Sequence, residues 1–197
     1  MISFIKKHWI LIALAFVAVM LLGLRVMLPA PGSKQEEGAL PTPTPEKGME
    51  VNWEGIEPGK SSVSTVKEKL GVPAREIREK ETVTLEYPSH TLVFPNLVVA
   101  KDEKVEFIKE RYSVSRGKNL FTKLVSEYGE PEMRFYGPRS SVGFDLYVWT
   151  KVGVAAVANG EQGQVMEVWY FVPGLSLGEF RTKWAKEYTT EEPKYRF

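Results

Sequence analysis

The chain has 197 residues, no cysteine and only two histidines, His8 and His90. Without cysteine there can be no disulfide bond, no thiol catalysis, no thiolate metal site and no thioether-linked lipid. Two histidines so far apart in the sequence leave almost no room for a histidine metal cluster or a catalytic dyad. The sequence therefore predicts neither thiol nor histidine chemistry, and no cofactor and no metal site.

Neither sign of charge dominates. The chain has 26 Lys and Arg against 25 Asp and Glu, a net charge of +1 and a pI of about 7.8. A nucleic-acid-binding protein normally shows a basic patch or stripe, so no nucleic-acid partner is predicted. Hydrophobic residues make up 43% of the chain and charged residues 26%, which is an ordinary globular composition.

A phosphate-binding loop is also missing, although the stretch Gly55-Ile-Glu-Pro-Gly-Lys-Ser-Ser62 is similar to the end of one. Such a loop needs four residues between its first glycine and the Gly-Lys-Ser/Thr triplet, so that backbone N–H groups surround the phosphates. Only three residues separate Gly55 from Gly59. The stretch is therefore interpreted as the start of a helix, with Ser61 or Ser62 as its N-cap.

The one long hydrophobic run is Trp9–Leu28, which is 20 residues long and contains a single charge, Arg25. A helix of this length spans the hydrocarbon core of a bilayer. Lys6 and Lys7 precede it, which places the N-terminus in the cytoplasm. We predict an uncleaved anchor in the inner (cytoplasmic) membrane, with the remaining chain outside the cytoplasm. A cleaved signal peptide is the alternative, but no A-x-A-like cleavage site follows the run.

A proline-rich segment separates this anchor from the rest of the chain, and its Pro-Thr-Pro-Thr-Pro core favours extended polyproline II. The predicted organisation is a cytoplasmic N-terminus at 1–8, a transmembrane helix at 9–28, a linker at 29–49, a first repeat at 50–112, a second repeat at 113–172, and a C-terminal helix and tail at 173–197.

An internal repeat defines the folded part. Gly59-Lys60 and Gly117-Lys118 each open the pattern G-K-x10-G-x-P, with a spacing of 58 residues between copies. Apolar residues at i, i+3 and i+7 within each copy predict a short amphipathic helix, and alternating segments after each copy predict antiparallel strands. Ser176 and Glu179 have capping-box spacing for a third helix. The predicted fold class is α+β, with two tandem helix-plus-antiparallel-sheet repeats, helices on one face, a C-terminal helix and one preceding transmembrane helix.

The first repeat resembles BamE/SmpA-type domains. The matching positions are Gly55, Ile56, Gly59, Ser61, Val66, Leu70, Gly71 and Pro73. The tandem arrangement is similar to the β-lactamase inhibitor protein, in which two such units form one curved sheet. The absence of cysteine departs from the lipoprotein members of this group. The resemblance implies a non-enzymatic, extracytoplasmic domain that binds other proteins across a sheet face.

Strand periodicity predicts where that face lies. Alternate residues of a strand point to opposite sides of its sheet. On 142–150 and 164–172, one set of alternating positions is rich in aromatic and acidic residues, as interface hot spots are. The candidate partner-binding face consists of Asp145, Tyr147, Trp149, Glu167, Trp169 and Phe171. The other interpretation is that these aromatics belong to a second small core.

Three functions remain open on sequence alone. The favoured one is a membrane-anchored extracytoplasmic protein-interaction or envelope-assembly module whose partner is another envelope or extracellular protein. The alternative is a domain that binds a small molecule, a lipid or a cell-wall glycan. An envelope hydrolase comes third: Asp145 and Glu167 could act as a carboxylate pair only if they face each other, and Ser113 and Ser115 have no evident histidine partner.

Overall fold

The computed structural model describes residues 51–91 and 93–195. The predicted membrane helix at 9–28 and the linker at 29–49 lie outside these residues, so both stay predictions. Within the described part of the chain, no helix is long and apolar enough to cross a membrane.

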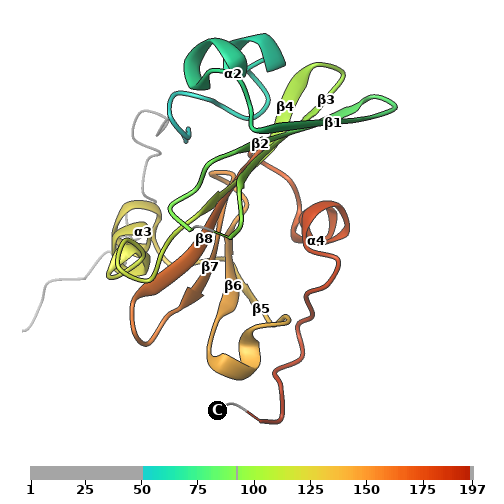
Figure 1. Cartoon of the computed structure of the whole chain (residues 1–197). Helices are drawn as coiled ribbons and strands as arrows, with labels where there is room; N and C mark the ends of the chain where they lie inside the picture. Colours follow the sequence, from blue (N-terminus) through green and yellow to red (C-terminus); the bar gives the residue numbers. More distant parts are fainter. Residues whose placement is uncertain (1–50, 92, 196–197) are drawn as a thin grey trace, which may run out of the picture. The chain divides into compact units, whose positions relative to one another are not determined.

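Eight antiparallel strands form a single sheet (Figure 1), in the order β1-β2-β3-β4-β8-β7-β6-β5. The first four strands are β1 (Arg75–Glu79), β2 (Thr82–Tyr87), β3 (Asn96–Lys101) and β4 (Lys104–Arg111). The other four are β5 (Met133–Phe135), β6 (Asp145–Trp149), β7 (Val154–Asn159) and β8 (Gln164–Phe171). The helices are α2 (Val63–Leu70), α3 (Leu120–Tyr128) and α4 (Leu177–Trp184), with a 3₁₀ turn η1 at Ser140–Val142.

The predicted fold class, two repeats that each carry their own sheet, is wrong. Strand β4 pairs directly with β8, from Phe107 opposite Phe171 to Arg111 opposite Glu167. This pairing merges all strands into one sheet. It satisfies the backbone N–H and C=O groups on strand edges that two separate sheets would have left open.

The chain follows the same path twice within this sheet. Residues 63–111 form a helix and a four-strand meander, and residues 120–171 do so again. Both meanders are irregular at matching places, between Val99 and Ala100 and between Val157 and Ala158. The two meanders meet only through their last strands, β4 and β8.

The two repeat helices end in the same way. Gly71 follows α2 and Gly129 follows α3, with φ values of 79° and 78°, a backbone region that favours glycine. Their N–H groups donate to Lys67 and Val125 carbonyls at 2.9 Å. The helix starts differ: the Ser62 side chain accepts from Thr65 N, as predicted, whereas Asn119 makes no side-chain cap hydrogen bond.

Helices cover both faces of the sheet, which corrects the prediction that they lie on one. Core clusters place α2 against β2–β4 and α3 against β6–β8 on one face. On the other face, Phe180 of α4 packs against Trp169 and Phe171 of β8. In Figure 1, α3 and α4 lie on opposite sides of the strands. Every residue of β6 is consequently buried.

Candidate functional site

The six residues predicted to form a partner-binding face do not share a face. Register places Asp145, Tyr147 and Trp149 toward α3, because Tyr147 lies opposite Ala156, which lies opposite Val168. Trp169 is one position on from Val168, so Glu167, Trp169 and Phe171 point to the face that α4 covers. All six side chains are buried. The structure therefore does not show the expected exposed aromatic patch.

The physical reason is the position of α4. An exposed aromatic patch requires one face of the sheet to be open, whereas the other interpretation, a second small core, requires both faces to be covered. Because α4 packs on the second face, both alternating sets lie in cores. Trp149 also donates its indole N–H to the Gly129 carbonyl at 2.8 Å, which fixes it to the end of α3.

A different feature is open to solvent. A hollow of about 500 Å³ lies at the end of β4 and the beginning of β8; we call it the cationic cup. Its lining residues are His90, Thr91, Val93, Phe94, Arg111, Tyr112, Ser113, Val114, Arg139, Met166 and Glu167.

Charged side chains form the floor of the cup around Glu167. Arg111 Nε lies 3.2 Å and Arg139 Nη1 3.9 Å from Glu167 Oε1, and Lys109 Nζ, which does not line the cup, lies 3.6 Å from Oε2. The Trp169 indole N–H donates to the same carboxylate at 2.9 Å. Of these groups, two arginines and one carboxylate line the cup, which leaves an excess of positive charge at its floor.

Burial alone would raise the pKa of Glu167. Lys109, the Trp169 hydrogen bond and Arg111 outweigh this, so the pKa lies below its ordinary value. Burial lowers the pKa of Lys109, although Glu167 partly opposes the change. Glu167 is therefore held as a carboxylate that anchors the cations.

The walls of the cup are apolar and exposed. Val93 is 75%, Phe94 51% and Val114 77% exposed, and these are three of the six exposed large hydrophobic residues of the described chain. The Arg111 guanidinium lies 5.4 Å from the centre of the Phe94 ring and donates to the Pro95 carbonyl. Asn96, which accepts from Arg111 N at 2.8 Å and donates to the Pro88 carbonyl, ties the wall to the sheet.

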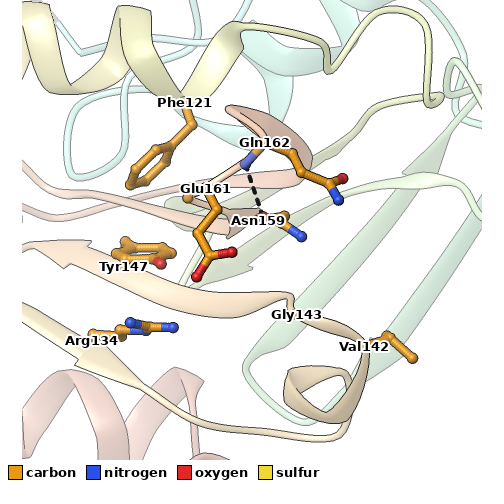
Figure 2. Close-up of a pocket in the computed structure, with 9 residues that line it drawn as sticks. Phe121, Arg134, Val142, Gly143, Tyr147, Asn159, Glu161 and Gln162 are labelled. Atoms are coloured by element: carbon orange, nitrogen blue, oxygen red, sulfur yellow. Dashed lines mark hydrogen bonds between the residues drawn. The ribbon is translucent and has the colours of Figure 1, made fainter. Parts of the chain in front are cut away.

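A second hollow, of about 440 Å³, lies beside α3 and the turn between β7 and β8 (Figure 2). We call it the polar hollow. Its lining residues are Phe121, Arg134, Val142, Gly143, Tyr147, Asn159, Gly160, Glu161 and Gln162. It shares no residue with the cationic cup.

Within residues 51–91 and 93–195, the side chains named for the hydrolase alternative do not form a catalytic arrangement. Asp145 and Glu167 lie on opposite faces of the sheet. Ser113 and His90 both line the cup, but the Ser113 hydroxyl pairs with Ser115 and His90 Nε2 lies 3.0 Å from Arg116 Nη1. The described residues also hold no group of three potential metal ligands.

No family model matches the chain, and no curated protein matches its sequence. Among solved structures it is similar to a DUF4309 family protein (YjgB) from Bacillus subtilis, with 18% identity, a TM-score of 0.43, and coverage of 60% of this chain and 83% of that one. It is also similar to a cysteine-rich secretory protein (SAV1118) from Staphylococcus aureus, with 12% identity and a TM-score of 0.38.

The second alignment covers 70% of this chain and 55% of the staphylococcal protein. Likeness at this level carries no functional argument. The resemblance to BamE/SmpA-type domains and to the β-lactamase inhibitor protein stays a prediction.

Proposed function

We propose that the chain is a membrane-anchored, non-enzymatic interaction module that works outside the cytoplasm. Its cationic cup binds a segment of another envelope or extracellular protein. The segment that fits is one that presents an apolar side chain next to a carboxylate, either from Asp or Glu or from a chain terminus.

The observation that carries the proposal is the gathering of exposed apolar side chains at one hollow. Exposed apolar patches rimmed by polar groups mark interaction sites on soluble domains. Val93, Phe94 and Val114 come from two separate connections, 88–95 and 112–119, and line the same cup. Phe94 provides the kind of large aromatic side chain that dominates binding energy at interfaces.

Charge selects among apolar partners. Two arginines, Arg111 and Arg139, line the cup against the single carboxylate of Glu167, so a carboxylate entering the cup meets net positive charge. Arg139 is the more exposed of the two, at 41%, and can donate a charge-assisted hydrogen bond. A segment with a cation at that place is repelled, which gives the cup specificity.

The membrane anchor rests on the sequence alone. The run Trp9–Leu28 has the length of a membrane-spanning helix, and the lysines before it favour a cytoplasmic N-terminus. The linker at 29–49 then holds the domain away from the bilayer, where it can reach a partner. This arrangement agrees with a single-pass protein of the cytoplasmic membrane.

The test is affinity capture from native membranes with a reversible crosslinker and quantitative mass spectrometry. Full-length wild type is compared with Phe94→Ser/Val114→Ser, which removes two exposed walls of the cup. Val72→Ser is the matched control, because Val72 is 92% exposed and does not line the cup. Substitutions of exposed side chains change the free energy of unfolding by roughly 0.5 kcal/mol or less.

We expect an envelope protein to be recovered with wild type and Val72→Ser and to fall about tenfold with the double variant, since two apolar contacts together contribute at least about 1.4 kcal/mol. Capture should also weaken at high ionic strength, because salt screens exposed charges. Equal recovery with all three proteins contradicts the proposal.

A further inference from the structure

We propose that the polar hollow is a second binding site, which takes the ring of a neutral or amino sugar. It uses none of the residues of the cationic cup and does not depend on the proposed protein partner. At about 440 Å³ it falls within the size range of small-ligand pockets, about 300–1,000 Å³.

Two aromatic rings form one side of the hollow. Phe121 from α3 and Tyr147 from β6 have ring centres 4.5 Å apart and an interplanar angle of 51°. Figure 2 shows both rings at the same end of the hollow. The C–H face of a sugar ring is apolar and packs on aromatic faces, and the half-buried Phe121 ring can offer such a face. Tyr147 is only 9% exposed, with Phe121 against its ring and the Arg134 guanidinium 5.5 Å from its ring centre, so it supports the Phe121 ring from behind the wall of the hollow.

Planar polar side chains line the other sides, which is what the hydroxyl groups of a sugar require. Glu161 supplies acceptors only, and the amides of Asn159 and Gln162 supply donors and acceptors. Asn159 Oδ1 accepts from Gln162 N at 3.0 Å, so the turn that carries all three is held in place. In Figure 2 the Glu161 carboxylate points between Tyr147 and Arg134.

The charge of the polar hollow disfavours carboxylates, which are the groups that suit the cationic cup. Arg134 donates through Nε to Asp145 Oδ2 at 2.8 Å, and Asp145 is fully buried. Two carboxylates, Asp145 beneath the wall and Glu161 on it, therefore accompany Arg134, the one cation among the lining residues. A phosphate or carboxylate is therefore disfavoured, whereas neutral hydroxyls and an amino group are accepted.

Glycine keeps the hollow open. A Cβ at Gly160 would lie 2.7 Å from Tyr147 Oη and 3.4 Å from Phe121 Cε1, and one at Gly143 would lie 2.8 Å from Asn159 Nδ2. Any side chain at these two positions would intrude on the groups that line the hollow. The two glycines thus keep side chains out of the wall of the hollow, while their backbone packs directly against the Tyr147 hydroxyl and the Asn159 amide.

The experiment is isothermal titration calorimetry on the full-length chain with two soluble probes, cellotetraose and the β-1,4-linked tetramer of glucosamine. The detergent is zwitterionic, because maltoside and glucoside detergents carry sugar rings that compete. The probes separate two sources of affinity: cellotetraose offers hydroxyls alone, and the glucosamine tetramer adds amino groups.

Variants then locate the site. Glu161→Ala/Gln162→Ala removes exposed polar groups from the hollow, and Glu130→Ala removes an exposed carboxylate elsewhere. We expect at least one probe to bind wild type and Glu130→Ala alike, and to bind the double variant about tenfold more weakly because hydrogen bonds to the sugar are lost.

Two outcomes overturn the proposal: no heat of binding from either probe with wild type, or binding that the double variant leaves unchanged. Gly160→Ala gives an independent check, since its methyl group narrows the hollow and should weaken binding with the charges intact. If that variant has a lower unfolding midpoint, the double variant alone decides.

Discussion

The two halves of the sheet, 63–111 and 120–171, share a backbone path but differ in what covers them. They are related about the pair Lys109–Trp169, the middle of the β4–β8 ladder. Phe107 lies opposite Phe171 two residues from this central pair in one direction along the ladder. Arg111 lies opposite Glu167 two residues from it in the other direction. These two pairs occupy equivalent positions on either side of the centre, yet one is an apolar pair and the other is an ion pair.

Helix α4 explains the difference, because it has no counterpart in the first half. Phe107 stacks on Trp184 with ring centres 4.4 Å apart, and Phe171 lies 4.7 Å from Phe180. Arg111 and Glu167 instead face the cationic cup. The comparison teaches that cover, rather than backbone geometry, decides which end of the ladder is core and which is available for binding.

Removing the side chain by which α4 covers the second face should have the largest effect on stability. Phe180 is fully buried against Trp169 and Phe171, so Phe180→Ala should lower the free energy of unfolding by about 3–5 kcal/mol. Urea unfolding followed by tryptophan fluorescence measures this loss. A loss below about 1 kcal/mol would mean that α4 does not hold the second face.

At the opposite end of the ladder, Glu167→Gln should cost about 3 kcal/mol at neutral pH, because it leaves Lys109, Arg111 and Arg139 without their carboxylate. Urea midpoints of the variant and wild type give the value. Urea is chosen over guanidinium because it leaves the charges unscreened.

The same variant should show a pH dependence of known sign. The pKa of Glu167 is lowered in the folded protein, so its contribution is fully present above its unfolded pKa of about 4.3 and is lost as pH falls through the lower folded value. The stability gap between wild type and Glu167→Gln should therefore narrow below about pH 4. A gap that stays constant down to about pH 2 contradicts the ion-pair account.

A smaller effect is expected at a pair of matching side chains on the face that α2 and α3 cover. The Tyr87 hydroxyl donates to the Gly71 carbonyl at 3.1 Å, as the Trp149 indole does to Gly129. Tyr87→Phe removes only that hydrogen bond and should cost about 1 kcal/mol. Thermal unfolding checks it, and an unchanged midpoint would show that the anchoring of the helix end does not matter in the first half.

The smallest effect concerns the helix starts. Ser62→Ala removes a side-chain cap and should cost about 1 kcal/mol. Asn119 has φ 59° and makes no cap hydrogen bond, so Asn119→Gly should change stability by less than about 0.5 kcal/mol. Paired urea titrations compare the two, and equal losses would contradict the structural difference between the caps.

Local features were predictable because they depend on neighbouring residues. The glycines that end α2 and α3 and the Ser176–Glu179 capping box follow from short-range backbone and capping chemistry. Strand β1, with the sequence Arg-Glu-Ile-Arg-Glu, is not predictable in this way, because it is a charged edge strand without an apolar alternation.

Long-range features were not predictable from the same signals. The β4–β8 pairing joins residues that are far apart in the chain, and no periodicity specifies it. The cationic cup draws Phe94, Arg111, Arg139 and Glu167 from separate segments, so no motif marks it. Tyr147 and Trp169 lie on opposite faces because the pairing through β7 sets Tyr147 on the face of Val168, and this register between distant strands is not specified by the periodicity of either strand.

The most direct test of the cup as a docking site is site-specific photocrosslinking in native membranes. A photoreactive amino acid replaces Phe94 in one full-length variant and Val72 in another, and mass spectrometry identifies the crosslinked peptides. The account predicts that position 94, but not position 72, links to one envelope protein through a segment with an apolar side chain beside a carboxylate. No crosslink at 94 above the level at 72, or attachment to segments without a carboxylate, would contradict it.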